Sequence, residues 1–382
     1  MPRAVYIHIP FCNRICPYCD FNKYVFKGQP VQEYVQALEK EMLLTFPFPS
    51  YSIPLGEGIQ TIFVGGGTPT VLTAEQLKEF LQSIKRQISF SELVEFTFEA
   101  NPETIDKEKL DIMLEYGVNR LSFGVQTFDR ELLKRLGRMH SPEDVYSSIS
   151  LARQSGFKNI SIDLMFGLPN QSLATFHETL DISFELGVEH FSAYSLKVEE
   201  GTFFHKLYQK DKLPLPTEED EVRMYSDLME RMRTEGYEQY EISNFSKPGF
   251  RSTHNLTYWR NAEYYGLGAG AHGYVQGRRH VNIAGVQEYI DTLAQDKLPY
   301  VSTHDVLTEE AMEDYMIMGL RTREGVSSIQ FQHNFHQPLE EVYTDQLQEL
   351  IQDQLIERTG DKYRLTREGM FLGNEVFEKF LH

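Results

Sequence analysis

The feature that most constrains this chain is a cysteine motif close to its start. The sequence has only three cysteines, and Cys12, Cys16 and Cys19 lie together with the spacing CxxxCxxC. Thiolates gathered on one short loop are soft ligands that suit zinc or iron–sulfur chemistry. A structural zinc site takes four ligands, whereas three thiolates on a 4Fe–4S cluster leave one iron open to a ligand from outside the protein.

Other interpretations of the three thiols remain open at this point. A disulfide framework would need an even number of cysteines and an oxidising compartment. His8 could complete a Cys3His zinc site, although zinc ligands usually come as two separated pairs. The thiols could also be buried and inert, as cysteine often is. The iron–sulfur interpretation explains both the number and the spacing of the cysteines, and we favour it.

Charge and hydropathy narrow the class of protein. The formal net charge of −19 argues against a nucleic-acid partner, because phosphate contacts need a basic face. The first residues lack the apolar stretch of a signal peptide, and no run approaches the length of a membrane-spanning helix. We therefore expect a cytoplasmic protein, where a reducing environment also suits exposed thiols.

The first half of the chain alternates strand-like and helix-like patterns. Short β-branched and aromatic runs are separated by amphipathic segments such as 31–46, 106–116 and 176–186. This alternation predicts βαβ units and a parallel sheet, either open or closed into a barrel. The six predicted strands are 5–9, 60–64, 94–99, 120–126, 159–166 and 190–196.

Polar residues recur where these strands end. The cysteine loop follows the first strand, a triple glycine at 65–67 follows the second, and Glu99 and Gln126 end the third and fourth. Asp163 lies inside the apolar fifth strand, where a buried carboxylate needs a partner. Ligands of parallel α/β proteins gather at the carboxyl ends of the strands, so these positions predict a ligand-lined mouth.

The rest of the chain has a different character. We divide it into a barrel over 1–215, a flanking α/β region over 216–302 and a small C-terminal domain over 303–382. The flanking region includes a long charged helix at 218–235 and a strand at 237–245. The C-terminal domain combines helices at 309–321, 340–352 and 367–380 with a hairpin at 355–365, which predicts a winged-helix-like module.

Taken together, the CxxxCxxC loop after a strand and the Gly-Gly-Gly-Thr-Pro stretch after the next strand resemble the radical S-adenosylmethionine (SAM) superfamily. The resemblance implies an α/β fold with a partial (β/α)6 barrel. It also implies a 4Fe–4S cluster held by Cys12, Cys16 and Cys19, with the amino and carboxylate groups of SAM on the open iron. In that family one electron from the cluster cleaves SAM.

The same resemblance carries over a set of SAM-contacting positions. Glu99 can accept hydrogen bonds from ribose hydroxyls, and Arg138 can pair with a carboxylate in fork geometry. A tight turn, a solvated strand end or a surface arginine would explain some of these residues without a ligand. The positions are Tyr6, Gly66, Gly67, Thr68, Glu99, Gln126, Arg138 and Asp163.

The resemblance is strongest to the oxygen-independent coproporphyrinogen III dehydrogenases and to the HemW-type haem chaperones. The dehydrogenases have a further cysteine two residues after the third, where this chain has Phe21, and an extension before the first strand. Both differences match the chaperones. The block from His254 to Trp259, His-Asn-Leu-Thr-Tyr-Trp, also matches their HNxxYW motif.

That block is the predicted haem contact, through His254, Asn255, Tyr258 and Trp259. An imidazole can ligate haem iron, and aromatic faces can pack on a porphyrin. His254 is the first candidate for the iron ligand and His272, in a glycine-rich loop, is the second. A hydrogen-bonded core histidine beside an aromatic cluster is the alternative explanation of the block.

The sequence thus predicts a haem chaperone that binds a 4Fe–4S cluster, SAM and haem and delivers haem to haem-requiring apoproteins. The resemblance implies membrane respiratory enzymes among the acceptors, a peripheral position at the membrane during transfer, and a homodimer when the cluster is loaded. Two alternatives remain: a radical SAM coproporphyrinogen III dehydrogenase, and a zinc-stabilised α/β binding protein.

Overall fold

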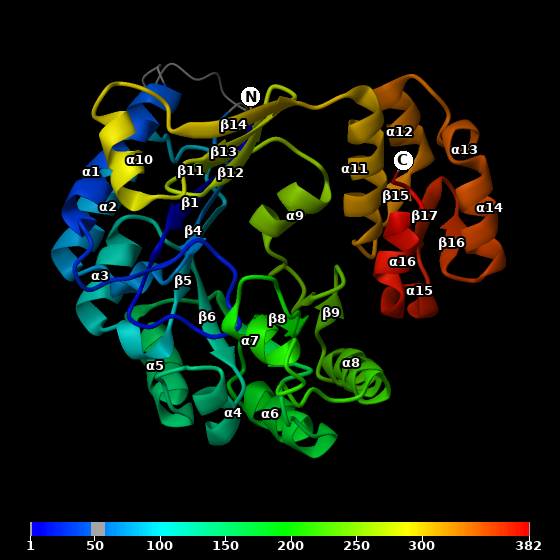
Figure 1. The fold of residues 1–382 in the computed structure, drawn as a ribbon, viewed down its shortest axis with the longest axis horizontal. Helices are drawn as coiled ribbons and strands as arrows, with labels where there is room; N and C mark the ends of the chain where they lie inside the picture. The colour runs from blue at the N-terminus through cyan, green and yellow to red at the C-terminus, as the bar shows by residue number, and fades with distance from the viewer. Residues whose placement is uncertain (1, 47–57, 382) are drawn as a thin grey trace.

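A nine-stranded sheet forms the centre of the molecule (Figure 1). The computed structural model describes residues 2–46 and 58–381. The six predicted strands are present, adjacent in chain order and parallel. They are β1 (Ala4–Ile9), β4 (Thr61–Gly66), β5 (Glu95–Ala100), β6 (Arg120–Gln126), β7 (Ile160–Phe166) and β8 (His190–Ser195).

Amphipathic helices cover the outer face of this sheet, as Figure 1 shows. Their starts follow local capping signals. Thr73 and Gln76 form a capping box before α2, and Ser141 caps α5 with proline at its first position. The helices are α1 (Val31–Thr45), α2 (Ala74–Gln87), α3 (Lys107–Glu115), α4 (Arg130–Arg135), α5 (Pro142–Ser155) and α6 (Leu173–Glu185).

The sheet extends beyond the six strands at both edges. β11 (Tyr265–Leu267) adds in parallel to β1, while β10 (Asn244–Ser246) and β9 (Glu238–Gln239) add antiparallel beyond β8. The prediction of one continuous strand over 237–245 was therefore wrong. The backbone turns back between β9 and β10, where the buried Glu241 side chain accepts hydrogen bonds from the Ser243 amide and the Asn244 side chain.

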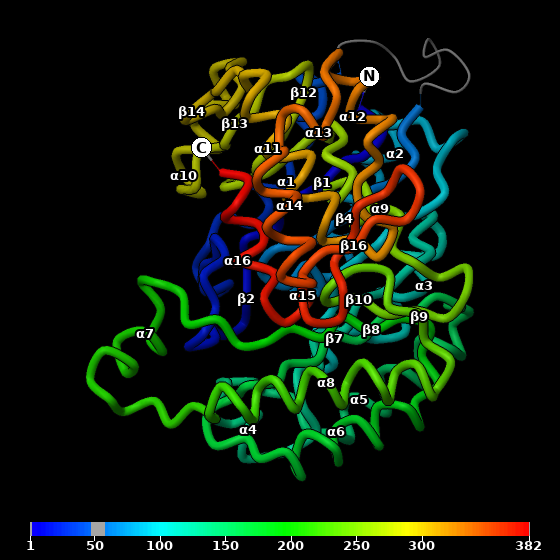
Figure 2. Tube along the Cα trace, turned by 90° about the vertical axis from the view of Figure 1, so that its right-hand side faces the viewer, coloured from blue at the N-terminus to red at the C-terminus, as the bar shows by residue number. Residues whose placement is uncertain are grey.

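The flanking region holds a second sheet that the sequence analysis did not predict. β12 (His272–Val275), β13 (Arg278–Asn282) and β14 (Tyr300–Asp305) are antiparallel neighbours. β14 spans residue 303, where we placed the start of the C-terminal domain. The helices of this part and of the preceding connection are α7 (Phe203–Tyr208), α8 (Glu218–Thr234), α9 (Thr253–Trp259) and α10 (Val286–Leu293). Figure 2 shows α7 standing away from the barrel.

The C-terminal elements form a separate small layer beside the barrel (Figures 1 and 2). A three-stranded sheet in the order β15-β17-β16 includes the predicted hairpin, and helices pack around it. The elements are α11 (Thr308–Leu320), β15 (Val326–Ser327), α12 (Ser328–Phe335), α13 (Leu339–Val342), α14 (Thr344–Gln352), β16 (Ile356–Thr359), β17 (Lys362–Leu365), α15 (Arg367–Phe371) and α16 (Gly373–Glu378).

Short elements complete the barrel mouth. β2 (Phe11–Cys12) pairs in parallel with β3 (Tyr24–Val25). The rest of the cysteine loop connects these two short strands. Two single turns follow strands of the barrel, η2 (Pro69–Val71) and η3 (Pro102–Thr104). Over residues 2–46 and 58–381, no helix combines the length and the apolar character needed to cross a membrane.

Candidate functional site

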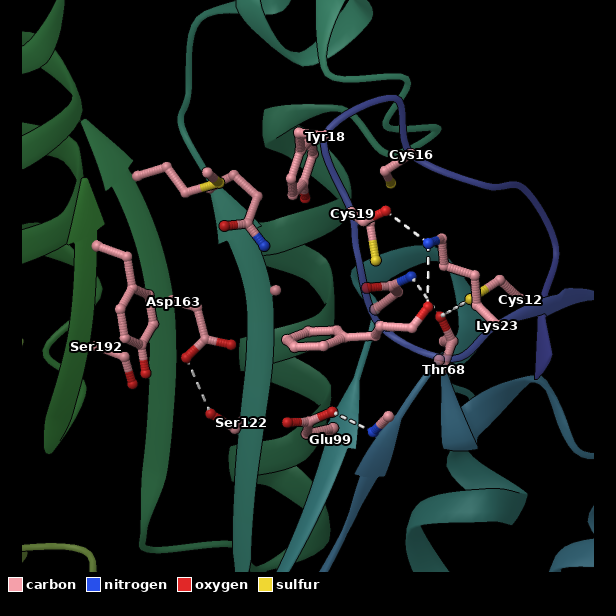
Figure 3. Close-up of a pocket in the computed structure, with 18 of the residues that line it drawn as sticks. Cys12, Cys16, Tyr18, Cys19, Lys23, Thr68, Glu99, Ser122, Asp163 and Ser192 are labelled. Atoms are coloured by element: carbon pink, nitrogen blue, oxygen red, sulfur yellow. Dashed lines mark hydrogen bonds between the residues drawn. The ribbon is translucent and has the colours of Figure 1, made fainter. Parts of the chain in front are cut away.

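A cavity of about 580 Å³ opens at the carboxyl ends of the parallel strands. Its wall carries side chains from the cysteine loop and from the ends of five neighbouring strands, β4 to β8 (Figure 3). The tertiary structure therefore brings together residues that are far apart in the sequence. Of the predicted site, it gathers Cys12, Cys16, Cys19, Gly66, Gly67, Thr68, Glu99, Gln126, Arg138 and Asp163, with Asn255 from the HNxxYW block.

The three thiols lie on one side of this cavity (Figure 3). Cys12 is buried at the end of β2, and the Thr68 hydroxyl donates to its sulfur at 3.6 Å. The Arg138 guanidinium donates to the sulfur of Cys16 at 3.9 Å. Burial raises the pKa of the Cys12 thiol and raises that of Cys19 to about 11. Binding a metal centre here must therefore displace protons from the thiols.

The donor set fits a cluster better than a single ion. Within residues 2–46 and 58–381, no three His, Cys, Asp or Glu side chains are close enough to share one metal ion. A cubane cluster asks for a wider arrangement, because each thiolate ligates a different iron. The zinc alternative also needs His8, but both of its ring nitrogens are occupied, by the Tyr6 hydroxyl at 2.9 Å and the Asn22 carbonyl at 2.8 Å.

Two carboxyl groups face the same cavity from neighbouring parts of the sheet. Glu99 accepts a hydrogen bond from the Gly66 amide at 3.1 Å, and Asp163 accepts one from the Ser122 hydroxyl at 3.2 Å. Desolvation raises the pKa of Glu99 to about 8, and the charge of Asp163 adds to that shift. Glu99 is therefore largely protonated at neutral pH, so its carboxyl group can both donate to and accept from ligand hydroxyls.

Arg138 connects the cysteine loop to the barrel. Its guanidinium donates to the Asn101 side-chain oxygen at 2.6 Å and also to the Gly124 carbonyl. The residue precedes α5, on a loop that packs over the ends of β5 and β6. Burial opposes its charge, but the nearby Tyr18 phenol, the Cys16 thiol and the Glu103 carboxyl group raise its pKa overall. The arginine thus supplies a fixed positive charge beside the thiols, suited to a ligand carboxylate.

Gly66, the last residue of β4, and Gly67, which follows it, are required by the packing of the protein itself. A Cβ on Gly66, whose φ is +111°, would lie within 2.5 Å of the His8 ring, and one on Gly67 would lie 2.7 Å from the Phe11 carbonyl. The resemblance to the radical SAM superfamily implies that this stretch contacts SAM. The structure adds that the ends of β1 and β4 cannot come together with larger residues here.

Of the predicted SAM contacts, Gln126 lines this cavity and Tyr6 does not. Gln126 lines the cavity at the end of β6, where a register shift against β7 and a positive φ of 69° turn the strand. Tyr6 is absent from the wall of this cavity. Its hydroxyl bonds to His8, and its ring lines a second cavity of about 580 Å³ together with Tyr258 and His272.

The HNxxYW block lies in α9, and its side chains have different surroundings. His254 is fully buried, with one ring nitrogen bonded to the Thr61 hydroxyl at 2.9 Å and the other to the Tyr258 hydroxyl at 2.8 Å. Burial lowers its pKa to about 3, so it is a neutral core histidine. The ring of Trp259 instead packs against the Arg321 guanidinium, 4.5 Å from the ring centroid.

Sequence reasoning missed one basic residue in the depth of the cavity. Arg120 begins β6, is 1% exposed and lines the cavity together with Ser122 and Ser192. Its Nε atom has no hydrogen-bond partner among the residues that the structure describes. An arginine at the head of an otherwise apolar strand was the available signal. A buried guanidinium with an unpaired nitrogen indicates that this part of the cavity is built to receive a polar ligand.

Comparisons with known proteins agree with this geometry. A family model described as the radical SAM superfamily matches residues 6–182, and the HemN C-terminal domain matches residues 306–372. "Heme chaperone HemW" of Bacillus subtilis (strain 168) is 48% identical over 380 residues, which is 99% of both chains. The chain belongs to the HemW family. Its radical SAM membership implies a 4Fe–4S cluster and SAM, which the thiols and the cavity fit.

Other HemW relatives show the same full-length similarity. "Heme chaperone HemW" of Lactococcus lactis is 40% identical over 100% of this chain and 97% of its own length, and that of Escherichia coli (strain K12) is 33% identical over 100% and 98%. Coproporphyrinogen III oxidase (HemN) from Escherichia coli superimposes with a TM-score of 0.85, covering 99% of this chain and 90% of that chain at 22% identity. That likeness confirms the predicted fold: a partial radical SAM barrel followed by a small C-terminal domain.

Proposed function

We propose that this protein is a haem chaperone, which binds haem beside a SAM-liganded 4Fe–4S cluster and hands it to haem-requiring apoproteins. The observation that carries the proposal is HemW similarity along the whole chain, joined to three thiols at the mouth of a polar barrel cavity. Cys12, Cys16 and Cys19 hold the cluster in this proposal. When bound, the cluster supplies an open iron for SAM and a source of one electron.

The SAM-binding role falls to the residues that surround the thiols. Arg138 orients the carboxylate of the ligand through its fixed guanidinium, and Glu99 and Asp163 hold hydroxyl groups from the opposite wall. Gln126 adds an amide at the turn of β6, and Thr68 orients Cys12. Tyr6 acts from outside this cavity, through its hydrogen bond to His8.

The coproporphyrinogen dehydrogenase alternative has less support. Its family likeness is at the level of the fold, whereas HemW similarity extends to sequence over the full length. Phe21 also replaces the further cysteine of those enzymes, and its side chain is 61% exposed. We propose that the acceptors are haemoproteins, membrane respiratory enzymes among them, and that transfer takes place in the cytoplasm or at the membrane surface.

An anaerobic haem titration of cluster-loaded protein tests the proposal. We expect saturable binding in the micromolar range or tighter, read from the Soret band and from quenching of Trp259, the only tryptophan. Haem-loaded protein mixed with a haem-free b-type cytochrome should then lose its spectrum as that of the cytochrome appears.

The Cys16→Ser variant serves as the cluster-free control in the transfer step. Absence of saturable haem binding by the wild type would refute the chaperone proposal. An assay with coproporphyrinogen III, SAM and a reductant would then test the catalytic alternative directly.

A further inference from the structure

The second cavity borders the end of the cysteine loop, since Asp20 and Phe21 line it as well as the first cavity. It measures about 580 Å³, within the range of small-molecule sites, and its wall is largely aromatic and apolar. Tyr6 contributes from β1, Tyr258 from α9, and Tyr264 from the residue before β11. The exposed side chains of Phe21 and Val301 form part of its rim.

One histidine of this wall is available to a ligand. Of the histidines in the described residues, only His8 and His272 line either of the two cavities. His8 is buried, and both of its ring nitrogens are hydrogen-bonded. His272 begins β12 with an exposed side chain, and its ring forms no hydrogen bond within residues 2–46 and 58–381.

His254 cannot take that role in this conformation. Its two ring nitrogens bond to Thr61 and Tyr258, and its ring stacks on Phe63 with centroids 5.2 Å apart. Freeing a nitrogen would leave a buried hydroxyl group without its hydrogen-bond partner, which is unfavourable. The HNxxYW helix instead presents Tyr258 to the second cavity, where the tyrosine hydroxyl is fixed by His254.

We propose that the second cavity is the haem site and that His272 is the protein ligand of the haem iron. This inference rests on the proposed chaperone function and names the site through which it would act. An accessible imidazole meets the requirement of the iron, and tyrosine and valine side chains provide the apolar contact that a porphyrin face needs. The open rim leaves room for the two propionates to stay in water.

The location of this site ties haem binding to the cluster. Asp20 and Phe21, which directly follow Cys19, line both cavities. Asn22 then joins the cysteine loop to the neighbouring loops, because its side-chain amide donates to the Ala269 carbonyl at 2.9 Å and to the Ala284 carbonyl at 3.0 Å. A cluster that orders the cysteine loop therefore also orders one wall of the haem cavity.

The test compares His272→Ala with His304→Ala in cluster-loaded protein. His304 is a matched control, because it is exposed on β14 of the same three-stranded sheet and pairs with Glu310 away from both cavities. We expect His272→Ala to weaken haem binding at least about 10-fold and to shift the Soret band, while His304→Ala binds like the wild type. Added imidazole should restore the wild-type spectrum of His272→Ala, which a merely structural role would not allow.

Three outcomes would overturn the inference or the function beneath it. Wild-type affinity and an unchanged Soret band in His272→Ala would refute the ligand assignment while leaving the chaperone function intact. Displacement of haem by excess SAM would assign the second cavity to SAM instead. Failure of the wild type to bind haem at all would refute the proposed function itself.

Discussion

Replacing Glu41 with glutamine should remove a pH dependence of stability that this single buried carboxyl group creates. Glu41 lies on α1, is 0% exposed, and accepts hydrogen bonds from three groups of the flanking region. The donors are the Gly268 amide at 2.7 Å, the Asn282 side chain at 2.6 Å and the Tyr289 hydroxyl at 2.5 Å. The carboxyl group thus anchors the loop that leads to His272.

The magnitude follows from the pKa of this group. Desolvation raises the pKa of Glu41 from its ordinary 4.5 to about 7, although the three hydrogen bonds oppose the shift. Because the folded-state pKa is above the unfolded value, the contribution of Glu41 to stability is fully present below pH 4.5. It is lost as the pH rises through 7, and between pH 6 and 8 the loss is about 1.3 kcal/mol by linkage.

Glutamine changes this balance in a calculable way. The glutamine side-chain oxygen can still accept a hydrogen bond. Its NH2 group, however, faces a donor that bonds to a carboxylate oxygen in the wild type. Leaving this buried donor unpaired costs about 1–3 kcal/mol. That cost does not depend on pH. The destabilisation caused by Glu41→Gln should therefore shrink by about 1.3 kcal/mol from pH 6 to pH 8, as the wild type loses stability and the variant does not.

Urea unfolding of both proteins at several pH values between 6 and 8 measures this difference. The control is Glu33→Gln, an exposed position on the same helix, whose stability should run parallel to the wild type. Parallel curves for wild type and Glu41→Gln would show that Glu41 does not titrate in this range, and the argument from burial would be refuted.

Three further changes give direct tests of the site. Cys16→Ser should abolish iron and acid-labile sulfide loading while leaving the circular dichroism of the fold unchanged. His254→Ala should lower the free energy of unfolding by about 2–4 kcal/mol in urea, because it empties a buried site and leaves Thr61 without its partner. Gly124→Ala should weaken SAM binding about 10-fold by calorimetry, because its Cβ would lie 2.9 Å from the Arg138 guanidinium.

For each of these three variants there is a result that would contradict the prediction, and two of them have a control variant. A full cluster in Cys16→Ser would show that the ligand assignment is wrong. An exposed histidine such as His333 should be replaceable by alanine at little cost, and an equally small effect at His254 would contradict its role in the core. Gly187, with open space around its Cβ position, controls for glycine replacement, although its positive φ adds strain away from the site.

Most elements of the barrel could be predicted from the sequence, because the local preferences of each segment agree with its place in the fold. Apolar strands of six or seven residues, amphipathic helices between them and capping signals such as Ser141 before Pro142 each specify their own element. Polar residues at successive strand ends also predicted the cavity, because parallel strands bring their carboxyl ends to one edge. Glu99, Gln126 and Asp163 lie there as predicted.

Prediction from the sequence failed where contacts between distant residues determine the structure. The strand predicted over 237–245 is two short strands, because side-chain bonds from Glu241 turn the backbone between them. The β12–β14 sheet escaped notice, since its strands pair across segments that show little alternation. Arg120 was overlooked because its position at the head of an apolar strand, the one available signal, is also compatible with a solvated strand start.

The sequence by itself determined the chemistry of this protein: three thiols on one loop, and a succession of strands that bring polar residues to the same edge. Those properties depend on residue types and short spacings, which a sequence states directly. Only the tertiary structure decided which histidine is available to a ligand. The sequence ranks His254 ahead of His272, but in the fold Thr61, 193 positions away, and Tyr258 occupy both ring nitrogens of His254, whereas the His272 side chain is exposed.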